Sequence, residues 1–146
     1  MAIKGRLVGP NNEFVPYDQI LEDLGVKKET KSYMIDIDGT ICSLELFMTE
    51  DGKVDNDETK ALPYKERINH FNDLYDEGNE IHYWTARGTS TGSYEEKLKL
   101  TENQLIDWGA KYTSVKVGKP HYDVWIDDKA QNVDAYFNDW QMTQKS

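Results

Sequence analysis

Two pairs of aspartates in this sequence of 146 residues stand where they could share a metal ion. Asp36 and Asp38 end one short apolar run, and Asp127 and Asp128 directly follow another. Alternate residues of a strand point to the same side, so the carboxylates of Asp36 and Asp38 start on one face. Carboxylates this close raise each other's pKa unless a cation lies between them. A hard cation with oxygen ligands, Mg²⁺ above all, would stabilise such a cluster.

The elements that must position these aspartates alternate along the chain. Apolar runs predict strands over residues 33–37, 80–84, 112–117 and 123–126. Helical spacing of apolar residues predicts helices over residues 17–24, 63–77, 94–108 and 132–140. This order predicts an α/β fold with a parallel sheet, in which ligands bind at the carboxyl ends of the strands. We therefore expect convergence at one sheet edge of five polar residues: Asp36, Asp38, Thr85, Asp127 and Asp128.

Local signals refine the connections between these elements. Asp51-Gly52 lies between short apolar runs, which is typical of a hairpin turn. Pro63 suits the first turn of the helix that follows it. Thr101, with Gln104 three residues later, resembles a capping box and predicts that the helix over residues 94–108 consists of two pieces.

The same residues, in the same order, resemble the motifs of the haloacid dehalogenase superfamily, most of whose members are phosphatases. The four motifs are matched in turn by Asp36-Ile37-Asp38-Gly39-Thr40, by Thr85, by Lys119 within Gly118-Lys119-Pro120, and by Asp127-Asp128. They lie within residues 33–129, about two thirds of the chain. The resemblance implies a Rossmann-like three-layer sandwich around a small central parallel sheet, with strand order 4-1-2-3.

The resemblance also implies a role for each motif residue. Asp36 would be the nucleophile that forms an aspartyl-phosphate. Asp38 would protonate the leaving oxygen and then deprotonate the attacking water, a role that argues against halide displacement. Thr85 would hydrogen-bond a phosphoryl oxygen. Lys119 would neutralise developing negative charge and hold Asp36 as a carboxylate.

The implied metal is Mg²⁺, bound by the Asp36 carboxylate, the Asp38 main-chain carbonyl and one aspartate of the fourth motif. Asp128 is favoured as that direct ligand, with Asp127 behind it. Arg87 would contact a second anionic group or the leaving group, and a surface arginine is an equal alternative.

Lys116 competes with Lys119 for the phosphate. In the strand order 4-1-2-3, the chain has to cross from the third strand to a fourth strand on the far side of the first. The third strand would therefore end near Ser114, and Lys116 would lie in the connection.

Residues 1–31 form an N-terminal extension in this interpretation, and residues 32–146 form the phosphatase-like domain with a short flap at about 42–61. The 22 residues from Ile41 to Leu62 suffice for a hairpin but not for a large cap domain. An open site suits a large substrate, or a small one enclosed by residues 1–31 or by a second copy in a homo-oligomer. Within the superfamily, the runs around Pro63, Thr85 and Lys119 are similar to polynucleotide-kinase phosphatase domains and sugar-phosphate phosphatases.

The amino-acid composition argues against some classes of binding partner. Asp and Glu number 27 and Lys and Arg 17, so the formal charge of −10 disfavours a long nucleic acid or an anionic membrane surface. The single cysteine, Cys42, excludes an internal disulfide, and no segment is apolar enough for a signal peptide or a membrane span, so we expect a soluble, cytoplasmic protein. The expected function is Mg²⁺-dependent hydrolysis of a small phosphorylated metabolite, such as a sugar phosphate or nucleotide. The alternatives are a nucleic-acid-end phosphatase and a non-catalytic binding module.

Overall fold

The computed structural model describes residue 15, residues 17–26 and residues 30–144. They divide into two compact units. One spans residues 30–121 and contains the parallel sheet; the other contains the described residues before 30 and after 121.

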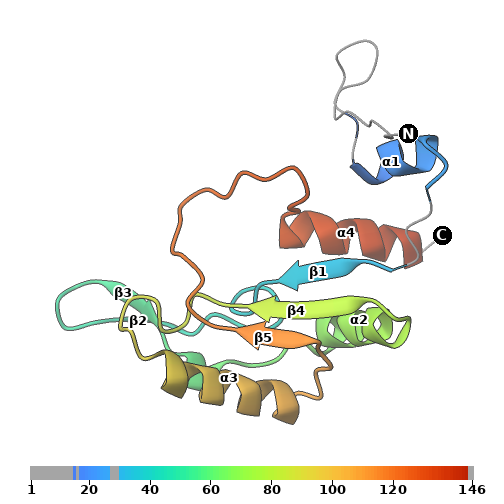
Figure 1. Ribbon diagram of the computed structural model, residues 1–146. Helices are drawn as coiled ribbons and strands as arrows, with labels where there is room; N and C mark the ends of the chain where they lie inside the picture. Colours follow the sequence, from blue (N-terminus) through green and yellow to red (C-terminus); the bar gives the residue numbers. More distant parts are fainter. Residues whose placement is uncertain (1–14, 16, 27–29, 145–146) are drawn as a thin grey trace. The chain divides into compact units, whose positions relative to one another are not determined.

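A small parallel sheet organises the first unit (Figure 1). Its strands are β1 (Ser32–Ile35), β4 (Glu80–Trp84) and β5 (Ser114–Lys116), hydrogen-bonded in the order β1-β4-β5. All of its pairings are parallel; Tyr33 lies opposite Ile81 and Tyr83 opposite Val115. The expected α/β class and parallel sheet are therefore confirmed.

Two helices cross between these strands and cover the buried sheet face. Helix α2 (Lys65–Asp76) leads to β4 and packs against it, and α3 (Tyr94–Asp107) leads to β5 and packs against that strand. Side chains alternate along β4, so that Ile81 and Tyr83 are fully buried while their neighbours are partly exposed. Ile68 of α2 and Leu105 of α3 complete this core. The helices connect successive strands, and the strand ends therefore lie at a common edge.

The segment between β1 and α2 contains an antiparallel hairpin, as expected. Strands β2 (Leu46–Met48) and β3 (Val54–Asn56) pair across the Asp51-Gly52 turn, and a 3₁₀ helix, η1 (Glu58–Lys60), follows. Gly52 has φ +82°, a left-handed conformation that favours glycine.

Two local predictions about helix ends were wrong. Pro63 precedes α2 and forms an isolated bridge with Cys42, because the chain there still runs beside the turn after β1. Helix α3 is continuous through Thr101, whose hydroxyl donates to the Lys97 carbonyl at 2.7 Å. Thr101 therefore lies inside the helix and caps nothing.

The second unit contains α1 (Tyr17–Asp23) and α4 (Val133–Gln144), both close to the expected positions. Asn132 caps α4, since its side-chain oxygen accepts from the Asp134 N–H at 2.9 Å. The rest of the predicted extension, residues 1–14, 16 and 27–29, lies outside the described residues.

The fourth predicted strand is absent: residues 123–126 are described and form no strand. A run this short specifies a strand only when a neighbouring edge pairs with it. Here the Asp127 carboxylate accepts the Lys129 N–H at 2.7 Å and closes a turn instead. The sheet therefore keeps the order of its first three strands without a fourth, and β5 continues to Lys116 rather than ending near Ser114. The three-layer arrangement stays a prediction.

Among the described residues, no helix combines the length and the apolar character that crossing a membrane requires.

Candidate active site

Asp36 follows β1 at the carboxyl edge of the sheet. The Thr40 hydroxyl donates to its carboxylate at 3.0 Å, and the turn behind it closes when the Ile41 N–H donates to the Ile37 carbonyl at 2.9 Å. Gly39 permits this turn because its φ is +82°. The Asp36 side chain is 39% exposed, so an incoming group can reach its carboxylate.

Lys119 lies beside this carboxylate. Its main-chain N–H donates to the Thr85 carbonyl at 2.9 Å, and its carbonyl accepts from the Thr89 hydroxyl at 2.7 Å. Its Nζ lies 3.7 Å from Asp36 Oδ1, whereas Lys116 ends β5 as an exposed residue. The structure thus brings Asp36 and Lys119 together, and Lys119 rather than Lys116 lies beside the carboxylate.

Burial and charge act on Asp36 in opposite directions. Burial raises the pKa of the Asp36 carboxyl, while Lys119 and the Thr40 hydroxyl lower it less strongly. Asp38 adds to the rise through like-charge repulsion. Lys119 therefore favours the carboxylate in the expected direction, but the net pKa is raised because burial is the larger influence.

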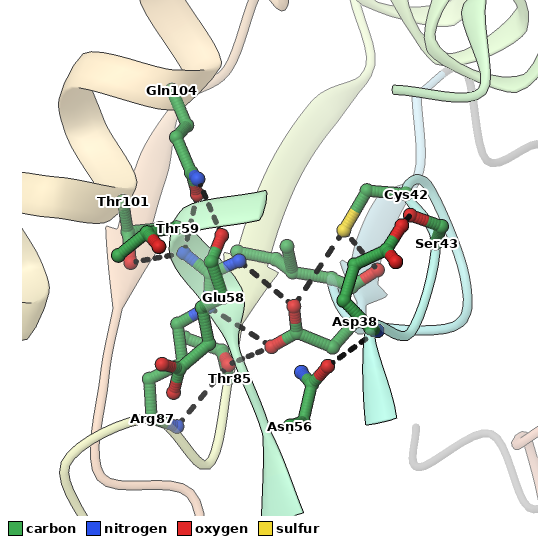
Figure 2. Close-up of polar contacts among 12 residues, drawn as sticks. Asp38, Cys42, Ser43, Asn56, Glu58, Thr59, Thr85, Arg87, Thr101 and Gln104 are labelled. Carbon is green, nitrogen blue, oxygen red and sulfur yellow. Dashed lines mark hydrogen bonds and ion pairs between the residues drawn. The ribbon is translucent and has the colours of Figure 1, made fainter. Parts of the chain in front are cut away.

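Asp38 is held by Arg87 in a two-point ion pair, shown in Figure 2. Arg87 Nε donates to Asp38 Oδ2 at 2.9 Å, and Nη2 donates to Oδ1 at 2.8 Å. The Arg87 side chain is only 1% exposed, and that of Asp38 is 16% exposed. Arg87 is therefore not the surface arginine of the sequence-based alternative, and its guanidinium faces Asp38.

Thr85 is also buried beside Asp38. Its hydroxyl lies 3.5 Å from Asp38 Oδ2 and accepts from the Arg87 main-chain N–H at 3.2 Å (Figure 2). The strand order thus brings Asp38 and Thr85 together at one edge of the sheet. The hydroxyl of Thr85 contacts Asp38 and Arg87, while the expected contact with a phosphoryl oxygen stays a prediction.

Asp127 and Asp128 belong to the other compact unit, and the strand expected to bring them to this edge is absent. Within the part of the chain that the structure describes, no three or more His, Cys, Asp or Glu side chains gather as a metal site. Magnesium is usually held by one or two carboxylates together with waters and substrate phosphate oxygens. The open carboxylate of Asp36 fits that donor set, whereas the Asp38 carboxylate is already used by Arg87.

Two residues of α3 that lie outside the sequence motifs support Arg87. Thr101 and Gln104 accept hydrogen bonds from Arg87 Nη1 at 3.1 and 2.6 Å. A sequence signal existed for Thr101, which stands in the apolar stripe of Leu98 and Leu105, where a polar side chain needs a buried partner.

Gly118 shapes the turn that carries Lys119, and we expect Gly118→Ala to damage it. Its φ is +78°, and an added Cβ would lie 2.9 Å from Tyr94 Cε1. We expect urea denaturation to show a loss of about 1–3 kcal/mol in the free energy of unfolding. Any hydrolysis of a phosphate ester by the protein should also be slower. Gly52→Ala is the matched control, since Gly52 has φ +82° with nothing within 4 Å of an added Cβ. Equal effects of both substitutions on activity would contradict a role for the Gly118 turn.

Cys42 is predicted to be chemically inert in the folded protein. Burial first, and then the charge of Asp38, raise the pKa of the Cys42 thiol to about 12. At pH 8 the native thiol should therefore resist iodoacetamide and react only after unfolding, because the thiolate is the reactive form. Mass spectrometry of native and urea-treated protein checks this. Rapid labelling of the native protein at pH 8 would show that the thiol is accessible and ionised.

Comparison with known proteins supports the fold alone. No family model matches the chain, and no curated protein matches it. The crystal structure of a target protein from Vibrio cholerae is similar over 79% of this chain and 98% of its own, with 23% sequence identity and a TM-score of 0.58. That protein carries no functional name, so activity has to be argued from the residues of the site.

Proposed function

We propose that this protein is a Mg²⁺-dependent phosphatase that hydrolyses a small phosphomonoester through an aspartyl-phosphate. The observation that carries the proposal is the pairing of Asp36 with Lys119: a reachable carboxylate lies 3.7 Å from an ammonium group at the carboxyl edge of a parallel sheet. A carboxylate that attacks phosphorus needs a nearby cation to offset the negative charge of the phosphoryl oxygens.

The chemistry begins at Asp36. One of its carboxylate oxygens attacks the phosphorus, the bond to the leaving oxygen breaks, and an aspartyl-phosphate forms. Lys119 balances the charge that develops on the phosphoryl oxygens. Water then attacks the same phosphorus, inorganic phosphate leaves, and the Asp36 carboxylate is restored.

In this proposal Asp38 is first the general acid and then the general base. It gives a proton to the leaving oxygen in the first step and takes one from the attacking water in the second, so its protonation state is restored over one turnover. Its side chain lies two residues beyond Asp36 and retains 16% exposure. Part of the Asp38 side chain is therefore open to solvent.

The Asp36 carboxylate and the Asp38 main-chain carbonyl would hold the magnesium ion, together with waters and phosphate oxygens of the substrate. When bound, the ion would neutralise charge on the transferring phosphoryl group.

A small metabolite is the favoured substrate class. The formal charge of −10 repels a long polyanion, while Lys119 supplies local positive charge for a single phosphate group. The hairpin and η1, rather than a large domain, stand between β1 and α2, so the substrate meets an open site.

Hydrolysis of p-nitrophenyl phosphate, with and without Mg²⁺, tests the proposal. We expect metal-dependent release of nitrophenol and phosphate, and turnover of one or more compounds in a panel of sugar phosphates and nucleotides. Oligonucleotides with 3′- or 5′-phosphates form the comparison arm, and faster turnover there would replace a metabolite by a nucleic-acid end. Absence of metal-dependent hydrolysis across all arms would contradict the enzymatic proposal and favour a binding module.

A further inference from the structure

All three side-chain nitrogens of Arg87 already donate hydrogen bonds within the protein. Its Nε and Nη2 donate to the two carboxylate oxygens of Asp38, and its Nη1 donates to Thr101 and Gln104 (Figure 2). The side chain is 1% exposed, whereas that of Asp38 is 16% exposed. A substrate can therefore reach Asp38 but not the guanidinium behind it.

The support behind Arg87 is itself held in place. The Thr101 hydroxyl donates to the Lys97 carbonyl at 2.7 Å, so it presents a lone pair to Arg87. The Gln104 amide nitrogen donates to the Glu58 carbonyl at 2.7 Å, which directs the amide oxygen toward Arg87. Arg87 is thus anchored to α3 and, through Gln104, to η1.

The Glu58 side chain adds a second link, because its carboxylate pairs with Lys97 at 3.1 Å. The segment after the hairpin is therefore joined to α3 at two points, and α3 in turn holds the guanidinium. A planar guanidinium that binds both oxygens of a carboxylate fixes the plane of that carboxylate as well as its position.

We propose that Arg87 is a positioning residue that orients the Asp38 carboxylate for proton transfer, with Thr101 and Gln104 as its supports, and that it does not bind the phosphoryl group. The inference rests on the proposed function, because it takes Asp38 as the general acid. It replaces the sequence-based expectation that Arg87 contacts an anionic group of the substrate.

The dependence of rate on the leaving group distinguishes the three roles that Arg87 could have. A misplaced general acid slows the release of a leaving group that needs a proton, such as an alkoxide, far more than the release of nitrophenolate. Loss of a phosphate ligand would raise KM for every substrate alike. A purely structural defect would lower the rate for all substrates by the same factor.

The experiment compares Arg87→Lys, Gln104→Ala and Asn103→Ala with the wild type on p-nitrophenyl phosphate and on an alkyl phosphate. Arg87→Lys keeps the charge and loses the two-point geometry; Gln104→Ala removes one support. Asn103 is exposed on the same helix and provides the matched control. If the wild type hydrolyses the alkyl phosphate slowly, a sugar phosphate or nucleotide that it turns over in the substrate panel takes the place of the alkyl phosphate.

For Arg87→Lys we expect kcat/KM, which reports the steps up to release of the leaving group, to fall by about 10²-fold on the alkyl phosphate and by less than about tenfold on p-nitrophenyl phosphate. KM should rise by no more than about twofold. Gln104→Ala should show the same pattern with smaller losses, and Asn103→Ala should resemble wild type. Arg87→Lys should also cause no further loss of kcat in an Asp38→Asn background, because the two residues act as a unit.

Two results would overturn the inference while leaving the proposed function intact. A raised KM at unchanged kcat would make Arg87 a phosphate ligand, and equal losses of kcat/KM on both substrates would make its role structural. If Arg87→Lys fails to fold, Gln104→Ala alone decides between these patterns. A wild-type protein that hydrolyses neither substrate would instead contradict the proposed function and the inference with it.

Discussion

Replacement of Asp36 by asparagine should lower phosphate release by about 10⁴-fold or more, because an amide cannot serve as the nucleophile. The steady-state rate with p-nitrophenyl phosphate is the first measurement. Acid quenching with ³²P-labelled substrate is the second: labelled protein should accumulate in the wild type, with the label on Asp36, and should be absent from the variant.

The stability of Asp36→Asn should be unchanged or slightly higher. The pKa of Asp36 is raised in the folded protein, mainly by burial, so folding disfavours its ionised form. A neutral amide of the same shape removes that penalty, although exposure to solvent reduces the gain. Urea denaturation at pH 7 measures the difference.

Asp107→Asn is the matched control for this substitution, since Asp107 is an exposed aspartate at the end of α3 and its replacement changes the net charge equally. We expect wild-type activity from it. Substantial turnover by a correctly folded Asp36→Asn variant, comparable to that of Asp107→Asn, would show that Asp36 is not the nucleophile.

Lys119→Met should lower kcat/KM by about 10²- to 10³-fold, with most of the loss in kcat. Lys119 Nζ lies 3.7 Å from Asp36 Oδ1 in a largely buried position, where a charge is screened less than in water. Its loss removes the main influence that lowers the pKa of Asp36. Steady-state kinetics with p-nitrophenyl phosphate at saturating Mg²⁺ provides the measurement.

Lys116→Met is the matched control, because Lys116 lies three residues earlier and is exposed at the end of β5. Its kcat/KM should stay within about twofold of wild type. The opposite pattern, a large loss from Lys116→Met and a small one from Lys119→Met, would assign the phosphate role to Lys116.

Much of the fold was predictable because its signals are local. An apolar run identified β4, and the turn residues Asp51-Gly52 identified the hairpin. The parallel arrangement followed from the alternation of strands and helices. Residues 123–126 show the limit of this reasoning, because a short apolar run forms a strand only with a paired edge, and pairing is not a local property.

Local sequence patterns also could not identify the hydrogen-bond partner of Thr101 and Gln104. Their three-residue spacing resembled a capping box, which is a contact between near neighbours. In the structure they bind the guanidinium of Arg87, which is 14 and 17 residues away along the chain. A buried guanidinium needs hydrogen-bond acceptors for its N–H groups. Which residues supply them is settled only when α3 packs beside Arg87.

The sequence by itself determined the α/β class, the chemical types available at the sheet edge and the place of Asp36 and Asp38 near the end of the first strand of the sheet. Only the tertiary structure decided that Lys119 rather than Lys116 lies against Asp36, and that Arg87 is buried against Asp38. The reason is physical. Residue types and periodicity are properties of short segments, whereas the approach of a charged side chain to its partner depends on how the turns after β1, β4 and β5 come together.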